Sequence, residues 1–186
     1  MPPYHSQITD DQIQGKVIGN TPLLPLKNIN KKSPTRTVPE PSNKSEPDIV
    51  DETLDLFKAN VFFTTYEVKE KSDRILIYST LYVILCLKKL AKSPNRAQAE
   101  RDMFALALQS FDLPGEAGFP LNPFFEKPKD NEKEELRKYL SQLRQEIGYR
   151  LIDRVFDAGL TGGEDKPSKW WTCFAKKKFL NVALSK

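Results

Sequence analysis

Histidine and cysteine are scarce in this sequence, and their scarcity restricts its possible chemistry. The 186 residues include one histidine, His5, and two cysteines, Cys86 and Cys173. Neither cysteine has a cysteine or histidine neighbour at the spacing of a zinc site or a redox motif. We therefore expect no metal centre, and we expect His5 to be a mobile, solvated side chain and not a catalytic base.

Sequence motifs of enzymes are missing as well. The chain contains no GxSxG, HExxH, P-loop or GxGxxG pattern. Paired acidic residues such as Glu134 and Glu135 point to different sides of a helix, so they cannot flank one substrate together. Cys86 lies in an apolar stretch and is expected to be inert, whereas lysines near Cys173 leave a reactive thiol as the less favoured interpretation. The sequence predicts neither an enzyme nor a cofactor.

Long hydrophobic runs are also absent. The longest nearly apolar run, residues 75–87, is well short of the roughly 20 residues that cross a bilayer. The first residues lack the basic and apolar regions of a secretory signal. We therefore expect no membrane span, and a cytoplasmic protein whose two thiols are free.

The composition is typical of a folded protein with one core, because 39% of the residues are hydrophobic, 29% charged and 10% aromatic. We expect an extended N-terminal arm (1–30), a flexible linker (31–47) and a single helical domain (48–186). Prolines between apolar residues make 17–27 an extended segment. The proline-rich linker has one large apolar residue, Val38, so it buries too little surface to offset its ordering entropy. A proline-rich docking ligand is the alternative interpretation of the linker.

The helical domain is predicted to hold about five helices and no sheet, which makes the fold all-α. Asp48 suits the cap of a first helix. The apolar stripe of this helix comprises Val50, Leu54, Phe57 and Val61. The run 72–90 leaves almost no polar face, so we expect it to be the central helix, capped by Ser72 or Asp73 and surrounded by protein. A strand is the rival interpretation of that run.

The third and fourth helices follow from the same periodicity. The third begins after Ser93, and its expected buried stripe comprises Ala97, Phe104, Leu108 and Phe111. The fourth runs from about Asp130 to about Ala158, and Gly148 inside it indicates close packing. Its apolar stripe comprises Leu136, Leu140, Leu143, Ile147, Leu151 and Val155. The apolar loop 113–125 is expected to pack on the domain's own core, with a partner as the alternative.

The C-terminal segment is predicted to form a short fifth helix that Pro167 and Ser168 open and that contains Trp170, Trp171, Phe174 and Phe179 among lysines. Residues 166–186 contain six lysines and no acidic residue. The candidate binding residues are Lys169, Trp170, Trp171, Lys176, Lys177 and Lys178. These residues fit a protein interface or single-stranded nucleic acid. In the simplest interpretation, the indoles close the core and the lysines face water.

Seven segments of the chain carry a resemblance to a known family. They are MPPYHS, VIGNTPLLPLK, DIVDETLDLFKANVFF, DRILIYSTLYVILCLKKL, LPGEAGFPLN, YLSQLRQEIGYRL and KPSKWWTCFAKKKFLN. In this order and spacing they closely resemble the 21 kDa subunits (subunit 3) of the actin-related protein 2/3 complex. The resemblance covers nearly the whole chain, and the departures are a longer linker at 31–47 and an insertion at 160–163.

The resemblance implies a non-catalytic, all-helical structural subunit of a seven-subunit assembly that nucleates branched actin filaments in the cytoplasmic actin cytoskeleton. It also implies contact chiefly with one actin-related subunit, in an assembly that binds an actin filament. Such a subunit would help to hold the two actin-related subunits in a filament-like arrangement. A free single-stranded nucleic-acid-binding module is the alternative function.

Two regions are candidate contacts within such an assembly. Because actin-type surfaces are acidic, we expect the C-terminal lysines to face an anionic partner, with Trp170 and Trp171 fixing their helix. The N-terminal segments 1–6 and 17–27 are the second candidate, because apolar residues between prolines gain stability only by lying on another surface. The sequence leaves open whether that surface is the chain's own core.

Overall fold

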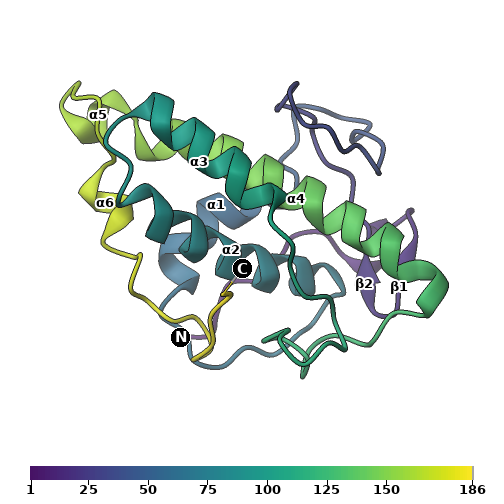
Figure 1. Ribbon diagram of the computed structural model, residues 1–186. Helices are drawn as coiled ribbons and strands as arrows, with labels where there is room; N and C mark the ends of the chain where they lie inside the picture. The colour runs from purple at the N-terminus through teal and green to yellow at the C-terminus, as the bar shows by residue number, and fades with distance from the viewer. Residues whose placement is uncertain (186) are drawn as a thin grey trace.

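Helices account for most of the regular structure in the computed structural model, which describes residues 1–185 (Figure 1). The six α-helices of that range are α1 (Ile49–Asn60), α2 (Ser72–Leu90), α3 (Arg96–Leu108), α4 (Lys133–Val155), α5 (Ala158–Thr161) and α6 (Lys169–Thr172). Short 3₁₀ turns span Asp10–Gln12 and Asp130–Glu132, and two strands, β1 (Val17–Ile18) and β2 (Thr21–Pro22), pair antiparallel. The prediction of a mainly helical chain is confirmed.

The small sheet contradicts the prediction that the chain has no strands. Val17 pairs with Pro22, and Ile18 pairs with Thr21. Between the strands Gly19 has a φ of +59°, a conformation that glycine adopts without strain. A strand of two residues is too short to show an alternating pattern of apolar and polar residues. The prolines of this segment exclude a helix, but proline is tolerated in a strand at the edge of a sheet.

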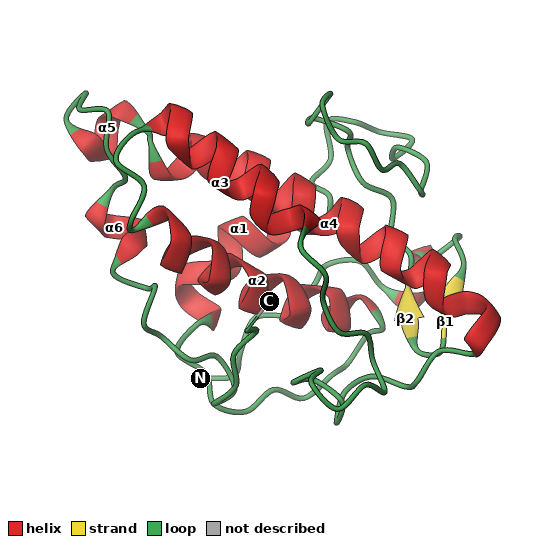
Figure 2. Cartoon of the chain, in the orientation of Figure 1, coloured by secondary structure: helices red, strands yellow, loops and turns green. Residues whose placement is uncertain are grey.

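Helix α2 lies at the centre of the core and contacts α1, α3 and α4 (Figure 2). Each residue from 75 to 84 is at most 2% exposed. The cap expected for this helix is wrong, because Lys71 precedes it without a side-chain cap. The carboxylate of Asp73 instead accepts hydrogen bonds from the backbone N–H groups of Lys69 at 2.9 Å and Glu70 at 3.2 Å. Asp73 therefore stabilises the loop that precedes α2.

Helix α1 has the N-terminal cap and the buried apolar stripe that the sequence predicts. Asp48 accepts a hydrogen bond from the backbone N–H of Asp51 at 2.9 Å, and the Asp51 side chain accepts the backbone N–H of Asp48 at 3.1 Å. This reciprocal capping box satisfies donors that the first turn of a helix leaves unpaired. The predicted stripe is buried in full and comprises Val50, Leu54, Phe57 and Val61.

Helix α3 turns a different face to the core from the one predicted. Phe104 and Leu108 of the predicted stripe are 46% and 48% exposed. The residues of α3 that are buried are Ala99, Met103, Leu106 and Ala107. Both sets recur at helical intervals, so periodicity alone could not decide between them. Phe111 is buried, but it lies beyond the end of the helix.

The close approach of α3 to α4 decides which face is buried. A Cβ atom added at Gly148 of α4 would lie 3.2 Å from the Cβ of Met103. Substitution of Gly148 by leucine should therefore destabilise the chain by about 1–3 kcal/mol, because the larger side chain forces the two helices apart. Chemical denaturation checks this, with the exposed Lys138→Leu of the same helix as the control. Equal stability of the two variants would contradict the packing described.

Helix α4 is shorter at both ends than predicted. Its first turn is preceded by the 3₁₀ turn Asp130–Glu132, and the helix ends at Val155 and not near Ala158. Asp157 then caps α5 by accepting a hydrogen bond from the backbone N–H of Gly159 at 2.8 Å. Gly159, which follows the predicted end of the fourth helix, is thus part of α5, because the Asp157 cap starts a new helix before it.

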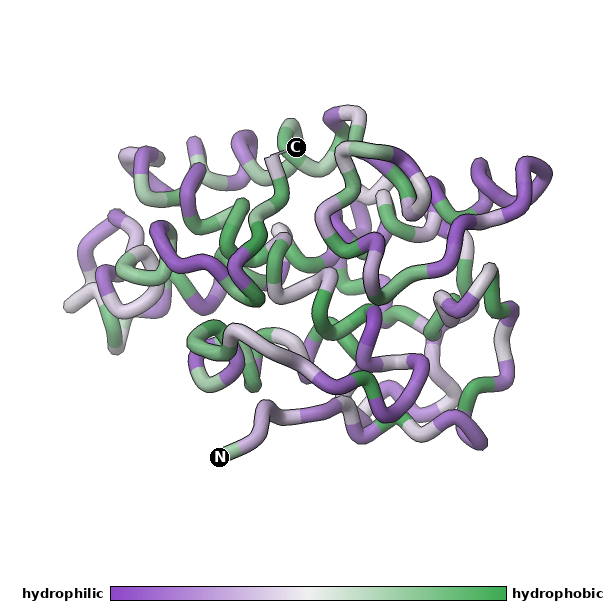
Figure 3. Tube along the Cα trace, turned by 90° about the horizontal axis from the view of Figure 1, so that it is seen from below, coloured by the Kyte–Doolittle hydropathy of each residue, from purple (hydrophilic) through white to green (hydrophobic). Residues whose placement is uncertain are grey.

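The N-terminal arm lies along the helical domain. Its buried apolar residues are at most 5% exposed and comprise Ile18, Leu23, Leu24 and Leu26. The backbone N–H of Leu24 donates a hydrogen bond to the hydroxyl of Tyr139 on α4 at 3.1 Å. In Figure 3 hydrophobic segments lie mainly inside the molecule and hydrophilic segments mainly at its edge. Segment 17–27 therefore packs on the chain's own core, which answers the question that the sequence left open.

The segment 31–47 forms a loop beside α4 (Figure 1). The backbone N–H of Thr37 donates to the side-chain oxygen of Gln142 at 2.7 Å, and the Ser33 hydroxyl donates to that of Gln145 at 2.5 Å. The first half of this segment is thus fastened to α4, while its flexibility stays a prediction. Among residues 1–185, no helix is both long enough and apolar enough to cross a membrane.

Candidate partner-binding surface at the C-terminus

Helix α6 is fixed at its start and on one face. Ser168 accepts a hydrogen bond from the backbone N–H of Trp170 at 3.2 Å, and its own N–H donates to the carbonyl of Val155 at 2.9 Å. Trp171 is 4% exposed and stacks on Phe57 of α1, with ring centroids 5.9 Å apart. The single turn of α6 is therefore held against the ends of α1 and α4.

The fifth helix is shorter than predicted, because α6 ends at Thr172 and the chain with Phe174 and Phe179 continues along the end of α1 without helix. The ring of Phe174 lies 5.7 Å from that of Phe57 and 5.9 Å from that of Phe62. Phe179 is fully buried, and the backbone N–H of the next residue, Leu180, donates to the carbonyl of Phe63 at 3.0 Å. Aromatic packing thus orders the segment that carries the lysines.

Five lysines and two aromatic rings remain exposed around this packed segment. We call them the C-terminal basic surface, which comprises Lys58, Phe62, Lys169, Trp170, Lys176, Lys177 and Lys178. Trp170 is 68% exposed and Phe62 is 60% exposed. The ammonium of Lys177 lies 5.3 Å from the centre of the Phe62 ring, and that of Lys58 lies 4.4 Å from the centre of the Trp171 ring. Within residues 1–185 none of these lysines forms an ion pair, so each keeps its charge available.

The two adjacent tryptophans, which were both predicted to bind a partner, have different environments in the structure. Trp171 fixes α6 through Phe57, whereas Trp170 points away from the core and is available to a partner. Adjacent residues on a helix face different directions, and the sequence does not show which of the two faces inward. The role of the six predicted residues in binding stays a prediction.

The two thiols differ in burial. Burial raises the pKa of Cys86 to about 12, whereas Cys173 is exposed beside the lysines. We expect a maleimide to label Cys173 rapidly in the folded chain and Cys86 only after denaturation, because the thiolate is the reactive form. Mass spectrometry of the labelled peptides tests this, and equal labelling of both cysteines in the folded chain would contradict it.

The N-terminal arm is fastened by a buried carboxylate, which makes the expectation for His5 wrong. His5 Nδ1 lies 2.9 Å from the Asp73 carboxylate, and the backbone N–H of Ser6 donates to that carboxylate at 2.9 Å. The Ser6 hydroxyl also donates to Glu52 at 2.6 Å. The imidazole is therefore held in place, because Asp73 lies close enough to bind it. Ser6 is therefore buried against the chain's own helices and His5 partly so, whereas Met1 and Tyr4 are 92% and 40% exposed.

Stability should fall in acid because of Asp73. Burial raises the pKa of Asp73, but hydrogen bonds from Ser6, Lys69 and His5 outweigh it and hold the pKa below the ordinary 3.8. A carboxylate with a lowered pKa contributes stability that is complete above 3.8 and is lost as pH falls through the folded-state pKa. Asp73→Asn should be less stable at pH 7 and should lose less on acidification. Parallel urea titrations at pH 7 and pH 3 check this, and equal acid losses would contradict it.

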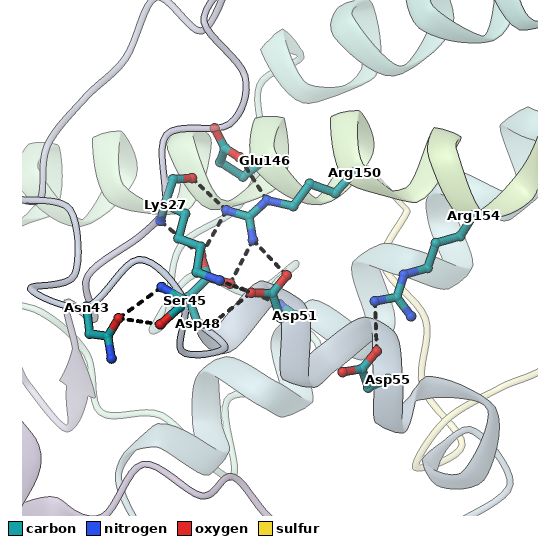
Figure 4. A network of polar contacts seen from close by, with 9 residues as sticks. All are labelled: Lys27, Asn43, Ser45, Asp48, Asp51, Asp55, Glu146, Arg150 and Arg154. Carbon is teal, nitrogen blue, oxygen red and sulfur yellow. Dashed lines mark hydrogen bonds and ion pairs between the residues drawn. The ribbon is translucent and has the colours of Figure 1, made fainter.

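Arg150 joins three parts of the chain through a network that the sequence analysis missed (Figure 4). Its guanidinium donates to the two carboxylate oxygens of Asp48 at 2.7 and 2.8 Å and to Glu146 at 3.1 Å. It also donates to the backbone carbonyl of Lys27 at 2.6 Å. The sequence holds a partial signal, since Arg144 and Arg150 fall on the side of the helix that carries the apolar stripe.

Arg144, one turn and a half earlier on α4, has a different environment. Its guanidinium lies between the rings of Tyr82 and Phe111, 4.5 and 4.4 Å from their centres. Within residues 1–185 none of its three guanidinium nitrogens has a hydrogen-bond partner. Two aromatic faces thus hold this buried cation. In the same range, no group of three or more His, Cys, Asp or Glu side chains is placed to hold a metal ion.

Comparison with known proteins gives a consistent result along the whole chain. The family model described as "P21-Arc: ARP2/3 complex ARPC3 (21 kDa) subunit" matches residues 1–184. The chain is 44% identical over 183 residues to "Actin-related protein 2/3 complex subunit 3" of Dictyostelium discoideum, covering 97% of this chain and 99% of the relative. It is 43% identical over 188 residues to the protein of that name from Schizosaccharomyces pombe, covering 99% and 100%. The Arabidopsis thaliana relative is 39% identical over 182 residues, covering 97% and 98%.

Proposed function

Since the chain belongs to the family of 21 kDa subunits of the ARP2/3 complex, we propose that it acts as a non-catalytic structural subunit that supports the nucleation of branched actin filaments. The observation that carries this proposal is the family match over residues 1–184. The place of action that follows is the actin cytoskeleton of the cytoplasm. The chain's contribution is geometric, because a rigid subunit holds its neighbours in position.

The mechanism is pre-organisation of the nucleus. Two actin-related subunits that are held side by side resemble the end of a filament, so the first actin monomer does not have to wait for a rare encounter of several subunits. Fixing them in advance removes the translational and rotational entropy that a spontaneous nucleus loses. The packed core around α2 and the buried network at Arg150 support this role because they make the chain rigid.

The C-terminal basic surface is the contact that we assign to an acidic face of an actin-related subunit. Its lysines have no competing ion pairs within residues 1–185. Trp170 provides an exposed aromatic anchor of the kind enriched at interface hot spots. Charges at the rim of such an anchor speed association and suppress wrong partners.

The C-terminal basic surface argues against the alternative function, a single-stranded nucleic-acid-binding module. Base stacking needs exposed aromatic faces. Trp171 is 4% exposed and already stacked on Phe57, so the pair of adjacent indoles that suggested such binding provides one free ring, Trp170. The family match over residues 1–184 also favours the assembly subunit.

Depletion and add-back test the proposed function. ARP2/3 complex isolated from cells depleted of this chain should form fewer branches per filament length, counted by fluorescence microscopy. Addition of the purified full chain should restore branch density. Undiminished branching by a complex shown to lack the chain would overturn the proposal, and so would an add-back that binds the complex without restoring branching.

A further inference from the structure

Helix α3 carries a second apolar stripe that the core does not use. Ala97, Phe104 and Leu108 recur at spacings of seven and four residues, which places them on one face of the helix. All three are exposed, while the buried stripe lies on another face of α3. A lone exposed apolar residue is ordinary, but a row along a helix marks an interaction site.

Helices α3 and α4 lie next to each other (Figure 1). A groove runs between them beside this stripe. Its volume is about 580 Å³. Phe104 of α3 and Tyr149 of α4, which are 46% and 41% exposed, form its apolar walls. Met103 and Ile152, each 2% exposed, form its floor. Gly148 keeps that floor shallow and fixed, because it allows Met103 to approach α4 closely.

A second hollow, of about 520 Å³, lies at the C-terminal end of α3, where Leu108 lines it. It shares no lining residue with the groove. The exposed stripe from Ala97 to Leu108 covers about three helical turns, roughly 16 Å at 1.5 Å per residue. An exposed apolar stripe of that length, beside a groove between two helices, fits a third helix that presents its own apolar residues at helical spacing.

Positive charge borders the groove. Lys31, Lys32 and Arg101 line it, and within residues 1–185 none of them forms an ion pair. Glu100 is the acidic residue of the lining, and it pairs at 3.3 Å with Arg96, which also pairs with Asp153. The border therefore has unpaired positive charge, which complements acidic residues on the edges of an incoming helix.

We propose that the groove between α3 and α4 receives an amphipathic helix with acidic flanking residues from another subunit of the assembly. This inference rests on the proposed function, since it takes the occupant from the same complex. The groove shares no residue with the C-terminal basic surface, so the chain could bind one neighbour at each of them. Two simultaneous contacts are what a subunit needs to fix the relative position of others.

Charge substitution in the groove tests the proposal. Phe104→Glu places a carboxylate on the apolar wall, and Ala105→Glu adds the same charge to an exposed position of α3 that does not line the groove. Both variants should unfold at the wild-type temperature, because both positions are exposed. In reconstitution with the remaining purified subunits, Phe104→Glu should incorporate at least about tenfold less tightly and Ala105→Glu should match the wild type.

A photo-crosslinking amino acid at Tyr149 identifies the occupant in the reconstituted complex. The expected product joins Tyr149 to an amphipathic, acid-flanked helical peptide of another subunit. A product with a second copy of this chain, a product with actin alone, or incorporation of Phe104→Glu at wild-type affinity would overturn the inference. If the wild-type chain itself does not incorporate, the proposed function fails; if both the wild type and Phe104→Glu incorporate equally, only the groove assignment fails.

Discussion

Substitution of Asp48 by alanine is expected to lower the free energy of unfolding by about 3–5 kcal/mol, because it leaves the buried Arg150 cation without its main partner. The side chains of Arg150 and Asp48 are 8% and 1% exposed. The carboxylate binds the guanidinium with both oxygens, and it also caps α1. Loss of the cap alone accounts for about 1 kcal/mol of the effect.

A matched control is available on the same helix. Asp55 lies seven residues after Asp48, and it pairs with Arg154 of α4 at 2.7 Å (Figure 4). That pair is mostly exposed, so Asp55→Ala should cost less than about 1 kcal/mol. Urea denaturation of both variants measures the difference. Equal losses would show that burial of the Arg150 pair does not matter.

Asp48→Ala should also weaken the attachment of the N-terminal arm. The backbone N–H of Lys27 donates to Asp48 at 2.9 Å, and its carbonyl accepts from Arg150 at 2.6 Å. Removal of Asp48 breaks the first contact and frees the partner of the second. Hydrogen exchange of the backbone amides in residues 24–30 should therefore accelerate in Asp48→Ala and stay at the wild-type rate in Asp55→Ala.

Reversal of the charges at Lys176, Lys177 and Lys178 is expected to weaken binding to the rest of the complex by about a hundredfold at low salt. Each change from lysine to glutamate replaces attraction by repulsion at an acidic partner face. All three side chains are exposed and free of ion pairs within residues 1–185, so folding should be unchanged. Salt screens the attraction, so the affinity of the wild type should fall as the salt concentration rises. The difference in affinity between the variant and the wild type should therefore become smaller at high salt.

The control for this triple variant has three lysine-to-glutamate changes near the N-terminal end of α4. Lys127, Lys129 and Lys138 are exposed lysines near the start of that helix, far from α6 in Figure 1. Their replacement by glutamate should leave the affinity close to wild type. Affinities are measured by titration of labelled chain into complex that lacks it. Equal weakening by both triple variants would show that net charge, and not the C-terminal basic surface, governs binding.

Labelling of Cys173 gives an independent view of the same surface. The thiol is exposed between Trp170 and Lys176 along the chain. If the C-terminal basic surface is covered by a partner, maleimide labelling of Cys173 should slow after incorporation into the complex. The buried Cys86 provides the internal reference, because its labelling requires unfolding in either state.

Local patterns predicted the helices well. The stripe of α4 is buried from Leu136 to Val155, and the capping box at Asp48 marks the start of α1, because both depend on residues that are near one another in sequence. Ser168 likewise begins α6. Caps and periodicity act within a few turns, so a single sequence contains the information that fixes them.

Contacts between distant segments could not be predicted in the same way. The exposed face of α3 depends on the fit of Met103 against Gly148, and the exposure of Trp170 depends on the stacking of Trp171 on Phe57. Of the partners of Arg150, Glu146 lies four residues earlier on the same helix, but Lys27 and Asp48 are about a hundred or more residues away, and no local pattern connects them to it. The candidate binding residues were found by charge and composition, but the fold decides which of them a partner can reach.

The proposed function requires that the chain work as a rigid part of an assembly of actin-related proteins. Gel filtration of native extract, followed by detection of this chain and of the actin-related subunits in each fraction, tests this most directly. We predict that the chain elutes together with those subunits at the size of the whole complex. Elution at the position of the free chain, without actin-related subunits in the same fractions, would contradict the account.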